Sequence, residues 1–341
     1  MRVLKGIPLR IALMGWLVAL VTLIGAVMAQ QNTPGKAPEI EARGLRHYQL
    51  RVVASSKVFS NVNRNDARAA LKVWFDVVAQ QRGYALYSTV DILDGVTEIR
   101  ERLESHSVEL ITLGMLDYLE LESSRLIVPV LTDARTSQGG ALYSYLLLVN
   151  PSSGVTAIAG LRGKNLLVAA RGSGETGVAW LEVLLGKEKL GRAPSFFASV
   201  KSVDKPQGCI LPVFFGAADA CVVDEINLDL AKEMNPQLGR LRVLARSRPM
   251  IESVIAVPAE PHPRQEELVD EMLILHQDPR GRQLLMVFKT ERIVRLQPGD
   301  LDAARELWRD YYRLPGVSPH RSAVFGPAAE SNPADRGKER H

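Results

Sequence analysis

The chain has 341 residues, of which 46% are hydrophobic and 23% charged, and its formal net charge is +4 at pH 7. Three basic residues, Arg2, Lys5 and Arg10, precede an uncharged stretch at residues 11–29, and without them the charge falls to +1. A basic nucleic-acid surface is therefore not indicated, and the remaining chain of about 310 residues is long enough for two lobes.

The first thirty residues have the composition of a targeting segment. A basic start, an uncharged stretch and the small residues Val27 and Ala29 before Gln30 favour a signal peptide cleaved after residue 29. The stretch at 11–29 is also long enough to stay as an uncleaved membrane anchor. In both cases we expect the rest of the protein to be exported to the periplasm, with residues 30–44 as a linker.

Strands and helices alternate through the first third of the chain. We expect strands at residues 48–54, 84–89, 108–113 and 126–131, separated by helices at 66–82, at 98–105 and around Tyr118. A loop follows at 133–140.

The same alternation continues from residue 142. We expect strands at residues 142–149, 165–170, 195–200 and 220–223, with helices at 178–190 and 205–215. Two more apolar runs lie within 241–257, the pattern from 263 to 314 is helical, and the tail at 315–341 has the composition of a disordered segment.

This order predicts an α/β protein with two lobes, each a mostly parallel sheet covered by helices. Two crossing strands, near residues 134 and 245, would join the lobes. Residues 45–133 and 246–314 would form the first lobe, and residues 134–245 the second. The cleft between two such lobes is a natural place for a ligand.

A glycine-rich loop stands between the strand at 165–170 and the helix after it. The sequence RGSGETG places glycines at 172, 174 and 177, where backbone N–H groups and the positive end of a helix can receive an anion. The spacing also matches the dinucleotide fingerprint, which asks for an acid at the end of the next strand. The run SFFASV does not end in one. A tight turn with close helix–strand packing is a third interpretation.

Cys209 and Cys221 are the two cysteines of the chain. A disulfide is permitted outside the cytoplasm, although the pattern favours two buried, apolar thiols. The six histidines are scattered and match no metal-ligand spacing, and neither a catalytic motif nor a cofactor is indicated. We therefore expect a protein that is not an enzyme.

Over residues 47–312 the chain resembles the periplasmic solute-binding proteins of ABC transporters, and most of all the phosphate/phosphite/phosphonate-binding type. The resemblance is carried by GLRGKNLLVAARGSGETG and by SVDKPQGCILPVFFGAADACVVDEINLDL. It implies a type II periplasmic binding protein fold, hinge closure on a small anion, and delivery of that anion to a membrane permease.

The resemblance also implies a set of ligand-binding residues. They lie after the first strand, in the short helix that follows the 108–113 strand, on the first crossing, at the start of the helix after the glycine-rich loop, and at the end of the 220–223 strand: Ser55, Ser56, Tyr118, Thr136, Ser137, Ser173, Glu175, Thr176 and Asp224. Lys57 is a further candidate, and Arg135 and Arg171 flank candidate loops where they could contact an anion, although arginines at such places are more often solvated.

Two features depart from the family pattern. Glu175 brings a carboxylate to the place where an anion would sit, and two like charges in a dry cleft repel each other. Gly114 and Met115 stand where the family often has an aromatic residue. A ligand with a cationic or hydroxylated arm, or a protonated Glu175, would reconcile the pattern with anion binding.

These observations predict an exported, monomeric binding protein that captures a small oxyanion, such as phosphate, phosphite or a phosphonate, for an ABC importer. The alternative is a sensory or interaction module of the same fold, free or anchored by residues 11–29, that signals ligand occupancy to a membrane partner.

Overall fold

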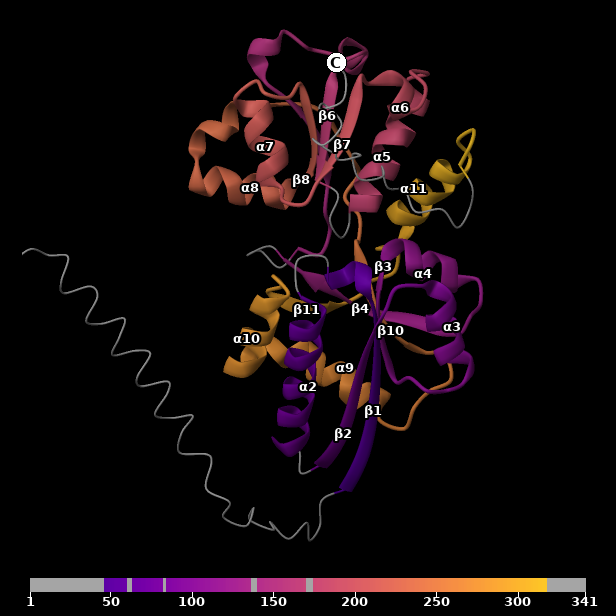
Figure 1. Ribbon diagram of the computed structural model, residues 1–341. Coiled ribbons are helices and arrows are strands. Elements are labelled where there is room, and N and C mark those ends of the chain that lie inside the picture. The colour runs from indigo at the N-terminus through magenta and orange to yellow at the C-terminus, as the bar shows by residue number, and fades with distance from the viewer. Residues whose placement is uncertain (1–45, 60–62, 82–83, 136–139, 170–173, 318–341) are drawn as a thin grey trace, which may run out of the picture. The chain divides into compact units, whose positions relative to one another are not determined.

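The strands of the protein form two separate sheets. The computed structural model describes residues 46–59, 63–81, 84–135, 140–169 and 174–317 (Figure 1). Within them, a six-stranded sheet has the order β11-β4-β10-β3-β1-β2, and a five-stranded sheet has the order β7-β6-β8-β5-β9. Helices pack on both sheets, so the predicted two-lobed α/β fold is confirmed.

The first lobe is built on the six-stranded sheet. Its strands are β1 (Arg46–Ser55), β2 (Tyr84–Leu93), β3 (Leu110–Gly114), β4 (Ile127–Ala134), β10 (Ser253–Pro258) and β11 (Arg292–Arg295). Its helices are η1 (Ser56–Phe59), α2 (Arg64–Gln81), α3 (Val96–Glu104), α4 (Met115–Glu122), α9 (Gln265–Ile274), η5 (Leu275–Gln277) and α10 (Pro279–Val287).

The second lobe is built on the five-stranded sheet. Its strands are β5 (Tyr145–Val149), β6 (Asn165–Ala169), β7 (Ser199–Val203), β8 (Ala220–Asp224) and β9 (Arg242–Arg246). Its helices are η2 (Pro151–Ser153), η3 (Ile158–Leu161), α5 (Gly174–Lys187), α6 (Ala193–Phe196), α7 (Gln207–Phe214), α8 (Glu225–Met234) and η4 (Pro236–Arg240). The apolar sequence YLLLV of β5 is buried at every position, as expected of a central strand covered on both faces.

Both sheets are mixed rather than mostly parallel. β1 runs parallel to β2 and β3, and β6 runs parallel to β7 and β8. In contrast, β10 is antiparallel to β3 and β4, and β5 is antiparallel to β8 and β9. β5 and β10, which are antiparallel to both of their neighbours, are the strands with which the chain enters one sheet from the other.

Two crossings join the lobes. The chain leaves the first sheet after β4 and enters the second at β5, and it returns from β9 to β10 through residues 247–252. Between the sheets, Tyr143 and Met250 form an antiparallel bridge, with N···O distances of 2.8 and 2.9 Å. The two crossings are therefore hydrogen-bonded to each other beside the place where the lobes meet.

Helix α11 (Asp302–Tyr312) connects the two lobes by packing. It follows β11 of the first sheet, yet it contacts α5 of the second lobe as well as α4 of the first. Ala304, Leu307, Trp308 and Tyr311 share one buried face at helical spacing, as the apolar pattern of the sequence predicted.

Two strands of the structure differ from the prediction. Residues 292–295 lie within the stretch expected to be helical, but they form β11, which pairs antiparallel with β4 at the edge of the first sheet. Ile293 is buried there between exposed arginines, a pattern too short to separate from a helical one. The strand expected at 195–200 is β7 at Ser199–Val203, because residues 193–196 turn into α6. Asp204 therefore follows directly after a strand.

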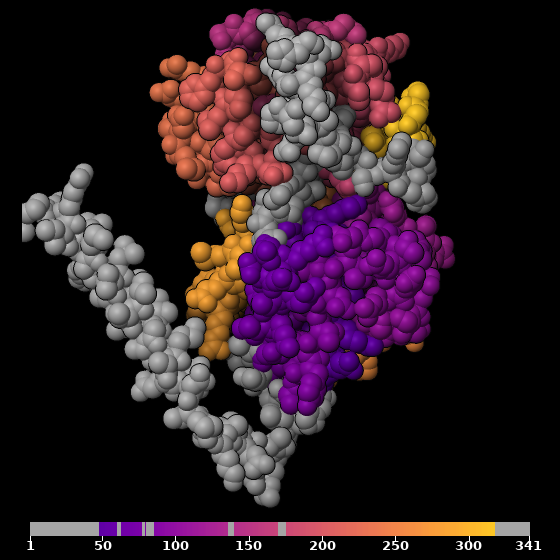
Figure 2. All heavy atoms as spheres, viewed as in Figure 1, coloured from indigo at the N-terminus to yellow at the C-terminus, as the bar shows by residue number. Residues whose placement is uncertain are grey.

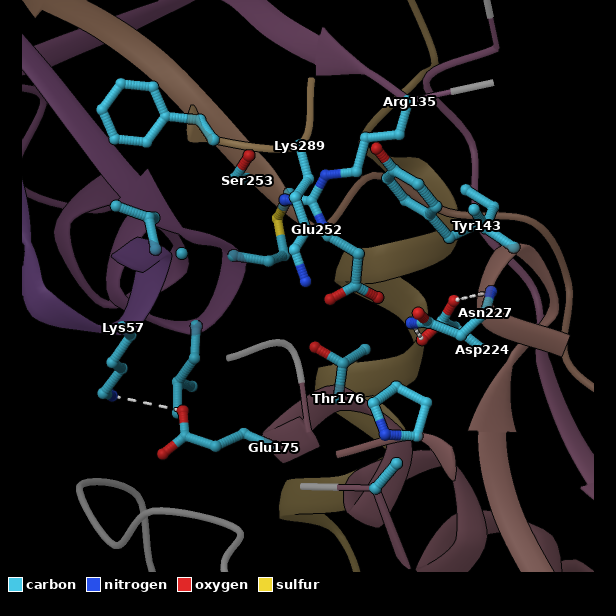
Figure 3. A pocket seen from close by; sticks show the side chains of 18 of the residues that line it. Lys57, Arg135, Tyr143, Glu175, Thr176, Asp224, Asn227, Glu252, Ser253 and Lys289 are labelled. Atoms are coloured by element: carbon cyan, nitrogen blue, oxygen red, sulfur yellow. Dashed lines mark hydrogen bonds and ion pairs between the residues drawn. The ribbon is translucent and has the colours of Figure 1, made fainter. Parts of the chain in front are cut away.

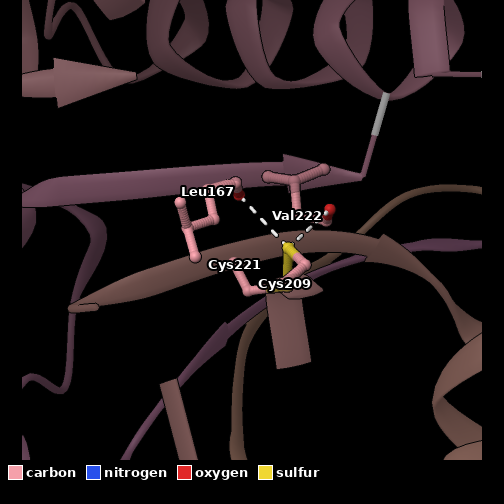
Figure 4. The surroundings of a disulfide bond; sticks show 4 residues. All are labelled: Leu167, Cys209, Cys221 and Val222. Carbon is pink, nitrogen blue, oxygen red and sulfur yellow. Dashed lines mark hydrogen bonds between the residues drawn. A yellow bond between two sulfur atoms is a disulfide. The ribbon is translucent and has the colours of Figure 1, made fainter. Parts of the chain in front are cut away.

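Cys209 and Cys221 form a disulfide, so the prediction of two free thiols is wrong (Figure 4). The bond joins α7 to β8, and both residues are fully buried. The sulfur of Cys209 also lies 3.4 Å from the carbonyl oxygens of Leu167 and Val222. The turn between α7 and β8 brings the two Cα atoms to 5.5 Å, a proximity that residue spacing alone does not reveal.

Figure 2 shows one face of the protein, with β1 to β4 and the helices between them in indigo to purple and the second lobe in magenta to orange. No helix in the described part of the chain is long and apolar enough to span a membrane. The segment at 11–29 lies outside that part, as do the linker at 30–44 and residues 318–341 of the tail.

Candidate functional site

A cavity of about 160 Å³ lies where the lobes and the two crossings meet (Figure 3). From the first lobe it is lined by η1, the start of α4 and the end of α10, and from the second by the starts of α5 and α8. The polar side chains that line it are Lys57, Arg135, Tyr143, Glu175, Thr176, Asp204, Asp224, Asn227, Glu252, Ser253 and Lys289. The cavity therefore presents charges of both signs.

The first turn of α5 opens into this cavity. Thr176 is only 3% exposed and lines the cavity, with Glu175 beside it. Gly177 packs against the ring of Tyr145 so closely that an added Cβ would lie 2.8 Å from the Cε1 atom. The absence of a side chain at Gly177 thus allows the N-terminus of α5, with its unsatisfied N–H groups, to approach the crossings. Such an N-terminus is suited to an oxyanion.

The carboxylate of Glu175 is neutralised by Lys57. The Lys57 Nζ atom lies 3.2 Å from Glu175 Oε2 and 2.8 Å from Asp117 Oδ1, and the pair with Glu175 joins the first lobe to the second. Burial lowers the pKa of Lys57, but the attraction of Asp117 and Glu175 outweighs it, so the pKa is raised and the ammonium stays charged. The repulsion expected between Glu175 and a bound anion is therefore reduced, though not removed, since Lys57 is shared between two carboxylates.

Arg135 is held beside the cavity by a network at the end of β4. Its Nε donates to Asp133 Oδ2 over 2.6 Å, and its guanidinium lies 5.6 Å from the centre of the Tyr143 ring. Burial raises the pKa of Asp133, but Arg135 and the donated hydrogen bond of Ser253 lower it by more. Asp133 is therefore ionised, and among the described residues the Arg135 side chain donates to this carboxylate through its Nε.

Lys289 adds a cation at the exposed rim of the cavity. It follows α10 in the left-handed backbone region, with φ of 52°. No carboxylate within the described residues lies at ion-pair distance from it. Of the three cations in the lining, Lys289 is thus the one whose charge no described carboxylate neutralises.

Asp204 and Asp224 bring carboxylates from the ends of β7 and β8, the two strands that flank β6 in the second sheet. Asp224 caps α8: its Oδ1 accepts from the backbone N–H of Asn227 at 2.9 Å, and its Oδ2 accepts from the Asn227 side chain at 2.5 Å. Asp204 follows β7, and both carboxylates line the cavity. Asp224 therefore caps a helix and lines the cavity at the same time.

Glu252 is the most unusual group in the site. It lies on the second crossing, is 6% exposed, and neither of its side-chain oxygens has a hydrogen-bond partner within the described part of the chain. Burial raises the pKa of Glu252 to about 8, and the charge of Asp224 adds to the effect. The hydroxyl groups of Tyr145 and Thr176, which lie near the carboxyl group, and the charge of Arg135 offset only part of the shift. Glu252 is therefore mostly neutral at pH 7 when no cation is near it.

The predicted site residues are only partly brought together. Glu175, Thr176 and Asp224 line the cavity, as do the further candidates Lys57 and Arg135. Thr136, Ser137, Arg171 and Ser173 lie outside the described residues.

Ser55, Ser56 and Tyr118 do not line the cavity, although the sequence predicted contacts with the ligand for them. Ser55 is fully buried and donates to Asp117 Oδ2 at 2.5 Å, so it acts on the site only through the carboxylate that holds Lys57. Ser56 lies against Asp94. Tyr118 is 2% exposed and donates to Glu122 at 2.9 Å. The strand-end and helix positions are correct, but these hydroxyls turn toward the protein.

Sequence reasoning missed several residues of the lining. The lining also includes Tyr143, Asp204, Asn227, Glu252, Ser253 and Lys289. The one available signal was the single acid before the apolar run SVIAV, since a carboxylate at the start of a buried strand requires either a partner or a function.

Comparisons with known proteins agree with this geometry. A family model described as "ABC transporter, phosphonate, periplasmic substrate-binding protein" matches residues 49–301. A search of curated proteins finds no significant match.

Solved structures share the fold at low sequence identity. A Xanthomonas citri protein bound to chloride has a TM-score of 0.56 and 17% identity, over 78% of this chain and 98% of that one. PhnD1 of Prochlorococcus marinus in complex with methylphosphonate has a TM-score of 0.52 and 14% identity, over 78% and 99%. A binding-protein component of a phosphonate ABC transporter from Pseudomonas aeruginosa has a TM-score of 0.52 and 12% identity, over 78% of this chain and 87% of that one.

Proposed function

The chain belongs to the family of periplasmic substrate-binding proteins of phosphonate ABC transporters, and from this premise we propose that its cavity captures a phosphonate that also carries a cationic group. The family is a transport component and not an enzyme, and it acts in the periplasm with a membrane permease. The ligand must fit both the cations and the carboxyl groups that line this cavity.

The start of α5 suits the oxyanion. Thr176 offers a buried hydroxyl there, and the start of the helix adds the positive end of the helix dipole. Lys57 lies on the opposite side and stays protonated. A phosphonate oxygen placed between them would gain charge-assisted hydrogen bonds, which are about twice as strong as neutral ones.

The part of the cavity around Glu252 suits a cation. Outside the ion pairs of Lys57 and Arg135, this part holds the carboxyl groups of Asp224, which accepts hydrogen bonds from Asn227, and of Glu252. An anion without a positive group would leave this part of the cavity electrostatically mismatched. The observation that carries the proposal is Glu252, a buried carboxyl group whose side-chain oxygens lack partners in the described structure.

A thermal-shift panel tests the proposal. We expect 2-aminoethylphosphonate to raise the melting temperature more than methylphosphonate, phosphate or sulfate, and ethylamine to have no effect. A ligand at a hundred times its Kd adds about 2.7 kcal/mol to the free energy of unfolding, enough for a shift of several degrees. Stabilisation by sulfate or by carboxylic acids alone would contradict it. Thr176→Val, which keeps the volume but removes the hydroxyl, should lower the affinity for both phosphonates.

We further propose that residues 1–29 are removed on export and that the mature protein is a monomer that binds no nucleic acid. The basic start and the small residues before Gln30 support cleavage, and a formal charge of +1 for the remainder supports the absence of a nucleic-acid surface. The intact mass of the protein isolated from the periplasm distinguishes cleavage from a retained anchor.

A further inference from the structure

Glu252 differs from the other buried glutamates of the protein. Glu109 is 5% exposed and is paired with Arg51, and Glu182 is 1% exposed and is paired with Arg192. Glu252 is equally buried, faces the cavity, and has no hydrogen-bond partner on either oxygen in the described structure. A buried carboxylate without a partner is strongly disfavoured, so such a group holds a proton until a cation reaches it.

Four groups from four different elements surround Glu252 and affect its protonation. Arg135 comes from the end of β4, Tyr145 from β5, Thr176 from α5 and Asp224 from the end of β8. Arg135 is the only cation among them, and it is already hydrogen-bonded to Asp133. Lys57, Glu175, Asp204 and Lys289 line the same cavity. Lys289 is the cation of the lining without a described partner, yet no described ion pair joins it to Glu252. An ammonium group of the ligand can therefore take the place beside Glu252.

We propose that Glu252 exchanges its proton for the cationic group of the ligand, so that capture of an amine-bearing phosphonate releases one proton. This inference rests on the proposed function. It adds that the affinity for the ligand depends on pH, and that Glu252 favours phosphonates with an amine over those without one. In the exchange, the O–H bond of the carboxyl group breaks, its electron pair stays on the oxygen, and the proton passes to solvent. The ammonium then donates to the carboxylate. A phosphonate without an amine leaves Glu252 protonated.

The linkage has a definite direction with pH. Since the pKa of Glu252 is raised from its ordinary value of 4.5 to about 8, the proton is lost as pH rises toward 8. The affinity for an amine-bearing phosphonate should therefore rise with pH up to about 8, because less work is needed to ionise Glu252. The affinity for methylphosphonate should not follow Glu252.

Isothermal titration tests the exchange with 2-aminoethylphosphonate and methylphosphonate as probes, at pH 7, in two buffers with different heats of protonation. Titration of the phosphonate group itself affects wild type and Glu252→Gln alike and cancels in their difference. For the amine-bearing probe we expect the wild type to release about one proton more than Glu252→Gln, and for methylphosphonate we expect no difference. Glu252→Gln should also bind the amine-bearing probe roughly tenfold more weakly.

Two further variants control the result. Glu252→Asp keeps an ionisable group and should retain part of the proton release, while Glu109→Gln changes a buried glutamate outside the cavity and should release as many protons as wild type. Equal proton release by wild type and Glu252→Gln, with both probes bound, would overturn the exchange alone. Failure of both probes to bind would instead overturn the proposed function, and the exchange with it.

Melting temperature provides a readout that needs no ligand. A raised pKa makes the wild type lose stability as pH rises from 4.5 to about 8, because the folded state retains a proton that the unfolded chain has released. Glu252→Gln lacks this group, so its melting temperature should exceed that of the wild type increasingly over this range. Parallel profiles would show that Glu252 holds no proton and would overturn the exchange.

Discussion

At the scale of single residues, the site depends on charges that compensate one another. Glu175 would repel an anion if it stood alone, yet Lys57 contacts it at 3.2 Å and also contacts Asp117. Ser55 donates to that same Asp117 from the other side. The chain of contacts from Ser55 to Glu175 explains why a carboxylate is tolerated at the start of α5. It also explains why Ser55 matters without lining the cavity.

Replacement of Lys57 tests this compensation. Lys57→Met should weaken methylphosphonate binding by tenfold or more, because Glu175 would face the anion without a neutralising cation and two like charges a few ångströms apart repel by about 1–4 kcal/mol. Isothermal titration measures the loss. The double variant Lys57→Met with Glu175→Gln removes the repulsion and should recover much of the affinity. If the double variant bound no better than Lys57→Met, Glu175 would not be the source of the loss.

At the scale of elements, most strands and helices were predictable from apolar periodicity. The buried run of β5 and the amphipathic face of α11 are examples. β11 was not, because its four residues pair only at a sheet edge and carry little pattern. Long-range pairing also decides that Asp204 follows a strand, that Cys209 meets Cys221, and that Glu252 faces the cavity. These three positions depend on contacts between segments that are distant in the sequence, and a single sequence does not predict such contacts.

The position of α5 leads to a second prediction. Gly177→Ala would place a Cβ 2.8 Å from the Tyr145 ring and push the start of α5 away from the cavity. We expect a loss of about 1–3 kcal/mol in the free energy of unfolding, as for other overpacked positions, together with weaker phosphonate binding. Urea unfolding and titration measure the two effects.

Gly186→Ala is the matched control, since it makes the same change at the other end of α5. Its Cβ would meet only the Cδ2 atom at the tip of the Leu314 side chain, at 2.7 Å, and a side-chain end can move aside. We expect a smaller loss of stability and unchanged binding. Equal losses of affinity in the two variants would mean that the start of α5 does not hold the ligand.

At the scale of the whole molecule, two lobes meet at a pair of crossings and at a cavity that both lobes line. The bridge between Tyr143 and Met250 ties the crossings together, and the Lys57–Glu175 pair joins the lobes across the cavity. A ligand that contacts α5 and Glu252 at once would add to these connections. Hinge closure around a small solute, as the family resemblance implies, requires contacts of this kind on both sides of the cavity.

A crystal structure of the protein with 2-aminoethylphosphonate bound tests the account most directly. We predict that the phosphonate oxygens lie at the start of α5, within hydrogen-bond distance of the Thr176 hydroxyl, and that the ammonium contacts the carboxylate of Glu252. A ligand bound outside the cavity, or one turned with its ammonium toward the start of α5, would contradict the account.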